Sequence, residues 1–157
     1  MEPKKDGGNK LLAKNRKARF NYSILESLEV GISLLGTEVK SMRNGKFSFT
    51  DAYAKISKND ELILVGFHIS PYDFGNLNNH EPERTRVLLA HKNEIKKLKR
   101  KVEERGCTLV PLKFYLKNGK VKLEIGVGTG KQSQDKRQTI KARDEKRAVE
   151  REFRQKF

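Results

Sequence analysis

The chain has 157 residues, with 35 Lys or Arg against 20 Asp or Glu, for a formal net charge of +15. Its hydrophobic fraction of 35% is below that of an ordinary globular chain, which favours one modest domain with charged extensions. Charge of this sign favours an anionic partner, either a nucleic acid or a membrane surface. With no apolar run near ~20 residues, no secretory leader and one Cys, the sequence predicts a cytoplasmic protein that neither spans a membrane nor contains disulfides.

The positive charge is densest at the two ends of the chain. Residues 1–19 hold seven basic and two acidic side chains, and residues 130–157 hold ten basic and five acidic ones. Residues 1–14 mix Lys, Gly, Asp and Asn without periodicity, which predicts a disordered arm. We therefore expect a folded domain over residues 15–129, between that arm and a basic tail.

Alternating apolar residues predict the first strands of this domain, over residues 20–28 and 30–34. Residues 37–45 predict a short helix, because a threonine can cap its start and Asn-Gly supplies a left-handed stop. Two more strand patterns follow over residues 49–56 and 61–69, with a polar turn between them.

The second half of the domain begins with a long polar loop over residues 70–86, and such loops are usually functional or disordered. Residues 88–104 predict the longest helix of the domain, with an apolar stripe on one face and basic side chains around it. Strand patterns over residues 107–116 and 120–127 flank Asn118-Gly119, a strong hairpin signal.

The tail, residues 130–157, has little apolar content. Val149, Phe153 and Phe157 lie four residues apart, and Ala142 lies seven residues before Val149. A helix with so thin a stripe cannot be held firmly on a core, so we predict a tail that is disordered alone and helical on a partner.

About six short strands and one long helix within about 110 residues predict a mainly β domain with flanking helices. The favoured architecture is a small closed antiparallel barrel resembling the oligonucleotide-binding fold.

The sequence offers no constellation with catalytic or metal-binding spacing. His68, His80 and His91 are dispersed, and Cys107 cannot build a zinc site without partners. The glycine-rich run 126–131 lacks the spacing of a phosphate-binding loop, and no nucleophile elbow occurs. We therefore predict a non-enzymatic protein without metal or cofactor.

Several residues admit both a structural and an RNA-binding interpretation. Glu29 interrupts a strand pattern, so it is either a surface carboxylate on a bulge or an acceptor for a base or ribose. His91 is either a helix cap, with Glu94 reaching back, or an imidazole that contacts RNA. The basic run 96–101 is either a solvated helix face or a phosphate contact. Phe20, which like Tyr22 follows a basic run, either fills the barrel or meets RNA.

A series of short motifs occurs in order along the chain. They are Asn15-Arg-Lys-Ala18, Tyr22-Ser-Ile24, Glu29-Val-Gly-Ile32, Leu35-Gly-Thr-Glu-Val-Lys-Ser41, Arg43-Asn-Gly45, Asp51-Ala-Tyr53, His68-Ile-Ser-Pro-Tyr72, Asn79-His-Glu-Pro82, Arg84-Thr-Arg86, Leu88-Leu89, His91-Lys92, Thr108-Leu-Val-Pro-Leu-Lys113, Gly130-Lys131 and Asp135-Lys-Arg137. Over residues 14–143 this series resembles the small protein B family, the bacterial transfer-messenger RNA-binding proteins.

The resemblance implies an oligonucleotide-binding-like barrel that binds the tRNA-like domain of transfer-messenger RNA (tmRNA). It further implies delivery of that RNA, with elongation factor Tu, to ribosomes stalled on messages without a stop codon. The tail would enter the empty message channel of the small subunit and fold there as a helix. The family expectation is a monomer in a one-to-one complex with the RNA.

The resemblance also assigns roles to residues. It places the acidic RNA-binding residue at Glu29 and a further RNA-binding pair at Leu89 and His91. The matched motifs and their charge add the remaining predicted RNA contacts, which are Asn15, Arg16, Lys17, Arg19, Tyr22, Lys40, Arg84, Arg86 and Lys92. The predicted tail residues are Gly130, Lys131, Asp135, Lys136, Arg137 and Phe153. The alternative function is a ribosomal protein whose basic arms bind ribosomal RNA.

Overall fold

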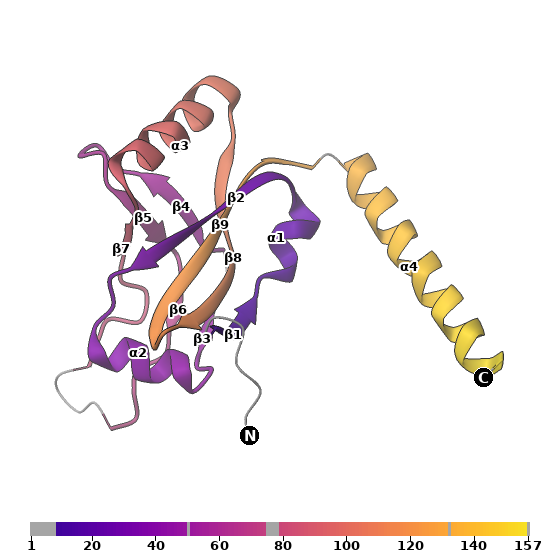
Figure 1. Cartoon of the computed structure of the whole chain (residues 1–157), viewed down its shortest axis with the longest axis horizontal. Helices are drawn as coiled ribbons and strands as arrows, with labels where there is room; N and C mark the ends of the chain where they lie inside the picture. The colour runs from indigo at the N-terminus through magenta and orange to yellow at the C-terminus, as the bar shows by residue number, and fades with distance from the viewer. Residues whose placement is uncertain (1–8, 50, 75–78, 132, 157) are drawn as a thin grey trace.

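A computed structural model describes residues 9–49, 51–74, 79–131 and 133–156 of the chain (Figure 1). The strands are β1 (Asn9–Lys14), β2 (Tyr22–Ile32), β3 (Phe47–Ser48), β4 (Tyr53–Ile56), β5 (Leu62–Val65), β6 (His68–Ile69), β7 (Arg86–Leu89), β8 (Thr108–Lys117) and β9 (Lys120–Gly130). The helices are α1 (Arg16–Asn21), α2 (Gly36–Arg43), α3 (Lys92–Arg105) and α4 (Ser133–Lys156). The prediction of a mainly β domain with flanking helices is therefore confirmed.

Seven strands form one antiparallel sheet in the order β1-β8-β4-β5-β7-β2-β9, and β9 also pairs with β8. The pairing is uneven along this order. Strand β9 pairs along most of its length with both neighbours, whereas β4 and β8 share the register pair Ala54–Leu109. This sheet does not establish the closed barrel that the sequence predicts.

The hairpin β8–β9 supplies much of the core, as its alternation predicts. Val121, Leu123, Ile125 and Val127 are all buried. The turn between the strands has positive φ at Asn118 (53°) and at Gly119 (79°), the backbone form that an Asn-Gly hairpin favours. A second group of core residues is aromatic and brings together the rings of Phe47, Phe49, Phe67 and Phe114.

Two glycines of the 126–131 run, Gly126 and Gly128, allow close packing of strands. A Cβ at Gly128 would collide with the carbonyl oxygen of Ser23 on β2, and one at Gly126 would lie 2.9 Å from a Leu112 methyl group. These residues lie within β9, which pairs with β2 and β8. Because larger side chains would separate the strands, the glycines have a packing role here.

The N-terminal segment departs from its prediction in two ways. Residues 9–14 form β1, paired with β8 from Asn9–Lys117 to Lys14–Lys113, so the predicted disorder is wrong for them, and residues 1–8 lie outside the description. Residues 16–21 form helix α1, so the strand predicted from residue 20 begins two residues later, at Tyr22. The side-chain oxygen of Asn15 caps α1 by accepting the N–H of Ala18 at 3.3 Å, and its amide donates to the Pro111 carbonyl at 2.9 Å.

The two middle helices differ from prediction at their starts. Helix α2 begins after Leu35, whose backbone N–H donates to Glu38 Oε1 at 2.8 Å, so Thr37 is not its cap. Helix α3 begins at Lys92, because residues 86–89 are needed as strand β7 between β5 and β2. Gly106 ends α3 with a φ of 65°, as an αL cap.

The tail forms helix α4, which stands apart from the sheet on the side where α1 lies (Figure 1). This differs from the predicted disorder of the free tail. Among the described residues, its attachments include a backbone hydrogen bond from Lys131 to the Asn21 carbonyl at 2.8 Å. The guanidinium of Arg143 also lies over the Phe20 ring, 5.6 Å from its centroid. None of the described helices has the length and apolar character that a membrane crossing requires.

Candidate nucleic-acid interface

Strand register places Glu29 and Leu89 on one side of the sheet. Glu29 pairs with Glu124 on β9, and two residues later Gly31 pairs with Leu89 on β7 and with Lys122 on β9. Residues two apart on a strand share a face, and paired residues on neighbouring strands do so too. Glu29, Leu89 and Lys122 therefore project from the same surface, although they are far apart in sequence.

Glu29 is surrounded by donors on this surface. A hydrogen bond from the Tyr115 hydroxyl lowers the pKa of Glu29, and burial opposes this less than the Tyr115 and Lys117 hydrogen bonds favour it. Lys117 Nζ lies 3.4 Å from Glu29 Oε1, and Lys122 adds a more distant positive charge. The Glu29 carboxylate is thus held ionised and oriented, while 40% of its side chain remains exposed to accept further hydrogen bonds.

Tyr115 donates a hydrogen bond to Glu29 from the neighbouring part of the sheet. The tyrosine is 9% exposed, and burial together with the hydrogen bond to Glu29 raises the pKa of its hydroxyl, which therefore remains a donor. Lys113 lies over its ring at 5.7 Å from the centroid and also pairs with Glu124 at 3.1 Å. This neighbouring lysine relieves the unfavourable pairing of Glu29 with Glu124 across the two strands.

The other end of this surface is apolar and then basic. Leu89 is 58% exposed, and its side chain lies over Gly31, where an added Cβ would be 3.2 Å from Leu89 Cβ. The His91 side chain is 90% exposed, and Lys92 beside it is also exposed. His91 is the N-cap residue of α3, as one interpretation predicted, but its side chain makes no capping hydrogen bond, and its Nε2 lies 3.9 Å from Glu94 Oε1.

We call this surface the outer face and define it by residues of the four strands β2, β7, β8 and β9 and of the start of α3. These are Glu29, Leu89, His91, Lys92, Tyr115, Lys117 and Lys122. It combines an oriented carboxylate, an exposed apolar side chain, an imidazole and three lysines. A carboxylate and an imidazole can bond to base edges, and lysines can bind phosphates.

The predicted contacts near α1 form a separate group. Arg16, Lys17 and Arg19 are exposed around the helix, and their phosphate contacts stay a prediction. Lys17 and Tyr22 line a hollow that Asn15 and Tyr53 border as well. The side chain of Asn15 caps α1 and donates a hydrogen bond to the Pro111 carbonyl, so it holds the helix in place.

Arg86 corrects one prediction, because its side chain is fully buried and cannot reach an RNA. Its Nε donates to Glu38 Oε2 at 2.5 Å, and Nη1 donates to the Phe67 carbonyl at 2.6 Å. Its Nη2 donates to the Pro82 carbonyl at 3.0 Å. Arg86 therefore binds the protein's own backbone and holds the polar loop on the sheet.

Arg84 belongs to the same buried cluster and is only partly available. Its Nη2 donates to Glu38 Oε1 at 2.6 Å, while a third of its side chain is exposed. Burial raises the pKa of Glu38, but hydrogen bonds from Arg84, Leu35 and Arg86 outweigh it and lower the pKa overall. Lys40 is the one of these three predicted cations that is exposed, and it lies over the Tyr72 ring at 5.3 Å.

His80 fixes the second half of the polar loop. Its Nε2 lies 2.9 Å from the Ile69 carbonyl, and its Nδ1 lies 2.8 Å from Thr37 Oγ1. The carbonyl can only accept, so Nε2 carries the proton and Nδ1 accepts from the Thr37 hydroxyl. Within the described residues no group of His, Cys, Asp and Glu could hold a metal ion.

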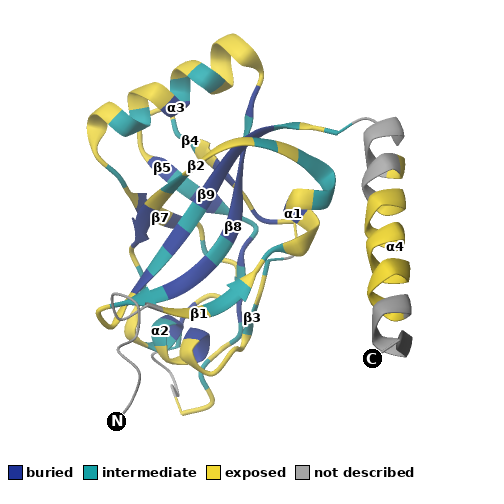
Figure 2. Cartoon of the chain, turned by 45° about the vertical axis from the view of Figure 1, so that its right-hand side comes forward, coloured by how far each residue is buried: buried dark blue, intermediate teal, exposed yellow. Residues whose placement is uncertain are grey.

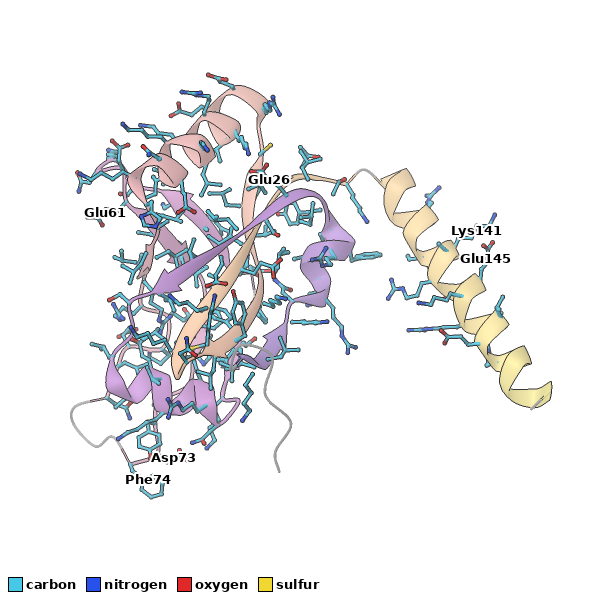
Figure 3. All side chains as sticks on the ribbon, viewed as in Figure 1. Glu26, Glu61, Asp73, Phe74, Lys141 and Glu145 are labelled. Carbon is cyan, nitrogen blue, oxygen red and sulfur yellow. The ribbon has the colours of Figure 1, made fainter. Side chains whose placement is uncertain are left out.

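The predicted tail residues are spread along the end of β9 and α4. Gly130 ends β9, Lys131 follows it, and Arg137 is exposed on α4. Asp135, Lys136 and Phe153 lie in α4, but their side chains fall outside the described part of the structure. In Figure 3 the labelled Lys141 and Glu145 project from α4 into solvent, away from the outer face.

Sequence reasoning missed Glu38, Tyr115, Lys117 and Lys122. The alternation of β9 placed Lys122 opposite the core, but nothing local tells which strand lies beside it. Strand register across β2, β9 and β8 is needed to bring these residues to Glu29. From the sequence, Glu38 could be recognised only as an acidic residue in the first turn of a helix, and not as the partner of buried arginines.

Comparison with known proteins identifies relatives of the whole chain. The sequence pattern of a family described as "SmpB protein" matches residues 12–155. An SsrA-binding protein of Trichodesmium erythraeum is 53% identical over 156 residues, covering 99% of both chains. An SsrA-binding protein of Treponema denticola is 56% identical over 144 residues, covering 92% of this chain and 93% of the relative.

Among solved structures, a chain described in "tmRNA-SmpB: a journey to the center of the bacterial ribosome" is similar in fold and sequence. It is 47% identical with a TM-score of 0.64, and the match covers 77% of this chain and 85% of that one.

Proposed function

The chain belongs to the SmpB protein family, and on this premise we propose that it binds tmRNA and acts with it in trans-translation on the ribosome. It is an RNA-binding protein and not an enzyme, because that is the character of the family to which it belongs. Two relatives named as SsrA-binding proteins match it over 99% and 93% of their own length.

The observation that carries the proposal is the outer face. Glu29 is ionised, oriented by Tyr115 and Lys117, and still exposed, which suits recognition of base or ribose donors. Leu89 and His91 offer an apolar surface and a ring beside it, and the flanking lysines suit phosphates. We propose that this face binds the tRNA-like domain, with Arg16, Lys17, Arg19 and Tyr22 contacting RNA around α1.

The tail is proposed as a second and separate binding element. Helix α4 is basic, exposed along its described length and attached to α1 by few contacts. The stability of such a helix is marginal by itself, so contact with the ribosomal RNA that lines a channel would stabilise it. We propose that α4 occupies the empty message channel of the small subunit, with Asp135, Lys136, Arg137 and Phe153 serving that step.

Further elements of the proposal are that the chain is a cytoplasmic monomer and reaches the ribosome with elongation factor Tu. The sheet is proposed to work as an oligonucleotide-binding-like barrel. The pairing of β8 with both β9 and β4 supports this, because it brings the first and last parts of the sheet together.

The test measures binding to a transcript of the tRNA-like domain and, separately, peptide tagging on stalled ribosomes. Glu29→Ala should weaken binding about tenfold or more, because it removes charge-assisted hydrogen bonds. Glu61→Ala is the matched control: the same charge is removed from an exposed position before β5, outside the outer face, and binding should not change. Truncation after Gly130 should abolish tagging while changing RNA affinity less than about threefold.

Two outcomes would contradict the proposal. Equal effects of Glu29→Ala and Glu61→Ala would mean that the outer face has no special role. A truncated chain that lost most of its RNA affinity would mean that the tail and the outer face are not separate elements.

A further inference from the structure

Three cations form a line along the exposed side of α3. Lys92, Lys96 and Arg100 lie four residues apart, which on an α-helix places them on one side at a spacing of ~6 Å. All three are exposed, and Figure 2 shows the outward side of α3 as exposed over much of its length. We call these residues the α3 cation row.

The row differs from two other cations of the same helix, which are paired with carboxylates. Lys99 pairs with Asp60 at 2.8 Å, and Lys101 pairs with Glu26 on β2. Within the described part of the chain, the three residues of the row make no ion pair. A carboxylate of the 57–60 turn and one of β2 thus pair with Lys99 and Lys101, whereas the row, like the exposed Lys97 and Arg105, makes no ion pair in the described part of the chain.

The arrangement of the row opposes the stability of the helix itself. Like charges four residues apart repel each other on a helix surface, whereas opposite charges at that spacing would stabilise it. Asn93 and Lys97, the other outward positions near the row, supply no carboxylate either. A bound polyanion would reverse this repulsion, which favours a binding role over a merely solvated face.

The row is also continuous with the outer face. His91 and Lys92 belong to that face and lie at the start of α3, and the row runs from Lys92 for about 12 Å along the helix. A hollow between the turn at residues 57–60 and α3 lies along it, lined by Lys92 and Lys96, with the neutralised Lys99–Asp60 pair at its edge. Glu103 and Glu104 follow Arg100 and limit the row at its far end.

We propose that the α3 cation row binds the phosphate backbone of the RNA that the outer face recognises, extending that site through Lys96 and Arg100. This rests on the proposed function, because the outer face must bind RNA first. The occupant is a stretch of RNA backbone, since the row offers three charges in a line and no aromatic ring or carboxylate to read bases. Phosphate contacts of this kind add affinity and fix orientation without reading sequence.

The experiment compares two double variants of the full chain in binding to a transcript of the tRNA-like domain, at several salt concentrations. Lys96→Ala with Arg100→Ala removes two charges of the row. Affinity should fall about tenfold at moderate salt, and the salt dependence should become shallower by about 1.5 to 2 in the log–log slope. Lys99→Ala with Lys101→Ala is the matched control, because it removes the same charge from the same helix at positions already paired with carboxylates.

The control should lower affinity less than about threefold and leave the slope unchanged. Equal losses of affinity and equal salt slopes in both double variants would overturn the proposal. They would mean that the RNA responds to the total charge of α3 and not to the row. A row variant that binds like the wild type would overturn it as well. A wild-type chain that does not prefer this transcript over a tRNA transcript refutes the proposed function, and the row proposal falls with it. Wild-type binding combined with an unaffected row variant refutes the row alone.

Discussion

The outer face and the tail are both basic, but different physics holds them in place. Each residue of the outer face lies on a strand or a helix start whose position is set by neighbours distant in sequence, as in Glu29–Glu124 and Gly31–Leu89. Helix α4 is set by its own sequence and touches the rest of the chain at a few described points near α1.

This difference corresponds to two modes of binding. A rigid surface with an oriented carboxylate can recognise one RNA, because its groups need little reordering on contact. A loosely attached basic helix can adapt to a channel, and it gains order there at an entropic cost. In the function proposed above, positive charge would thus serve recognition in one region and adaptation in the other.

The largest expected effect on stability comes from removing the carboxylate of Glu38, which pairs with the buried Arg86. Glu38→Ala would leave Arg86 buried without its counterion, and breaking such a pair costs about 3 to 5 kcal/mol. We expect the free energy of unfolding to fall by that amount. It is measured by urea denaturation, with far-UV circular dichroism reporting the loss of structure. Glu83→Ala, at a side chain 73% exposed on the same loop, should change it by less than about 0.5 kcal/mol. A loss under about 1 kcal/mol in Glu38→Ala would contradict this role for the cluster.

A smaller effect concerns the ionisation of Glu29. Its pKa is lowered from 4.5 in the folded chain, so the carboxylate stabilises the fold above pH 4.5, and this contribution disappears as the pH falls through the folded pKa. Because Glu29 is 40% exposed, solvent screening limits the contribution to less than about 1 kcal/mol.

The measurement compares the wild type with Glu29→Gln in urea at neutral pH and near pH 3. The wild type should be slightly more stable at neutral pH, and the difference should vanish in acid. A difference that grew as the pH fell would mean that the hydrogen bonds from Tyr115 and Lys117 do not favour the ionised form.

The smallest effect concerns the attachment of α4. Phe20→Ala removes the ring beneath Arg143, and an exposed contact of this kind is worth about 0.5 to 1 kcal/mol. Hydrogen exchange of the α4 amides should become about two to five times faster, with the exchange of the sheet unchanged. Phe20→Leu should have the same effect if the aromatic ring matters, and exchange at the wild-type rate in Phe20→Leu would show that bulk alone is sufficient.

Local patterns predicted much of the sheet. The alternation of residues 120–127 and the Asn118-Gly119 turn placed the β8–β9 hairpin correctly, because both signals act within a few residues. Helix α3 was predicted except at its start, where residues 88–91 were assigned to it. Apolar residues at positions 88 and 89 are compatible with a helix or a strand. They form part of strand β7 because this segment pairs with β5 and β2.

The candidate site divides in the same way. Resemblance to a family supplied Glu29, Leu89 and His91, and the structure places them on an exposed surface. The same reasoning offered Arg86 as an RNA contact, although its side chain is buried against Glu38. Sequence cannot distinguish an arginine that binds RNA from one that neutralises an internal carboxylate, because that depends on which carboxylate the fold brings near.

By itself, the sequence determined the sign and distribution of the charge, the hairpin, the helical stripe of α3 and the family. These properties depend on composition or on neighbours within a few residues. The tertiary structure decided that residues 9–14 pair as β1, that Tyr115 and Lys117 orient Glu29, and that Arg86 is internal. These outcomes depend on strand register and burial, which join residues up to about a hundred positions apart and leave no local trace in the chain.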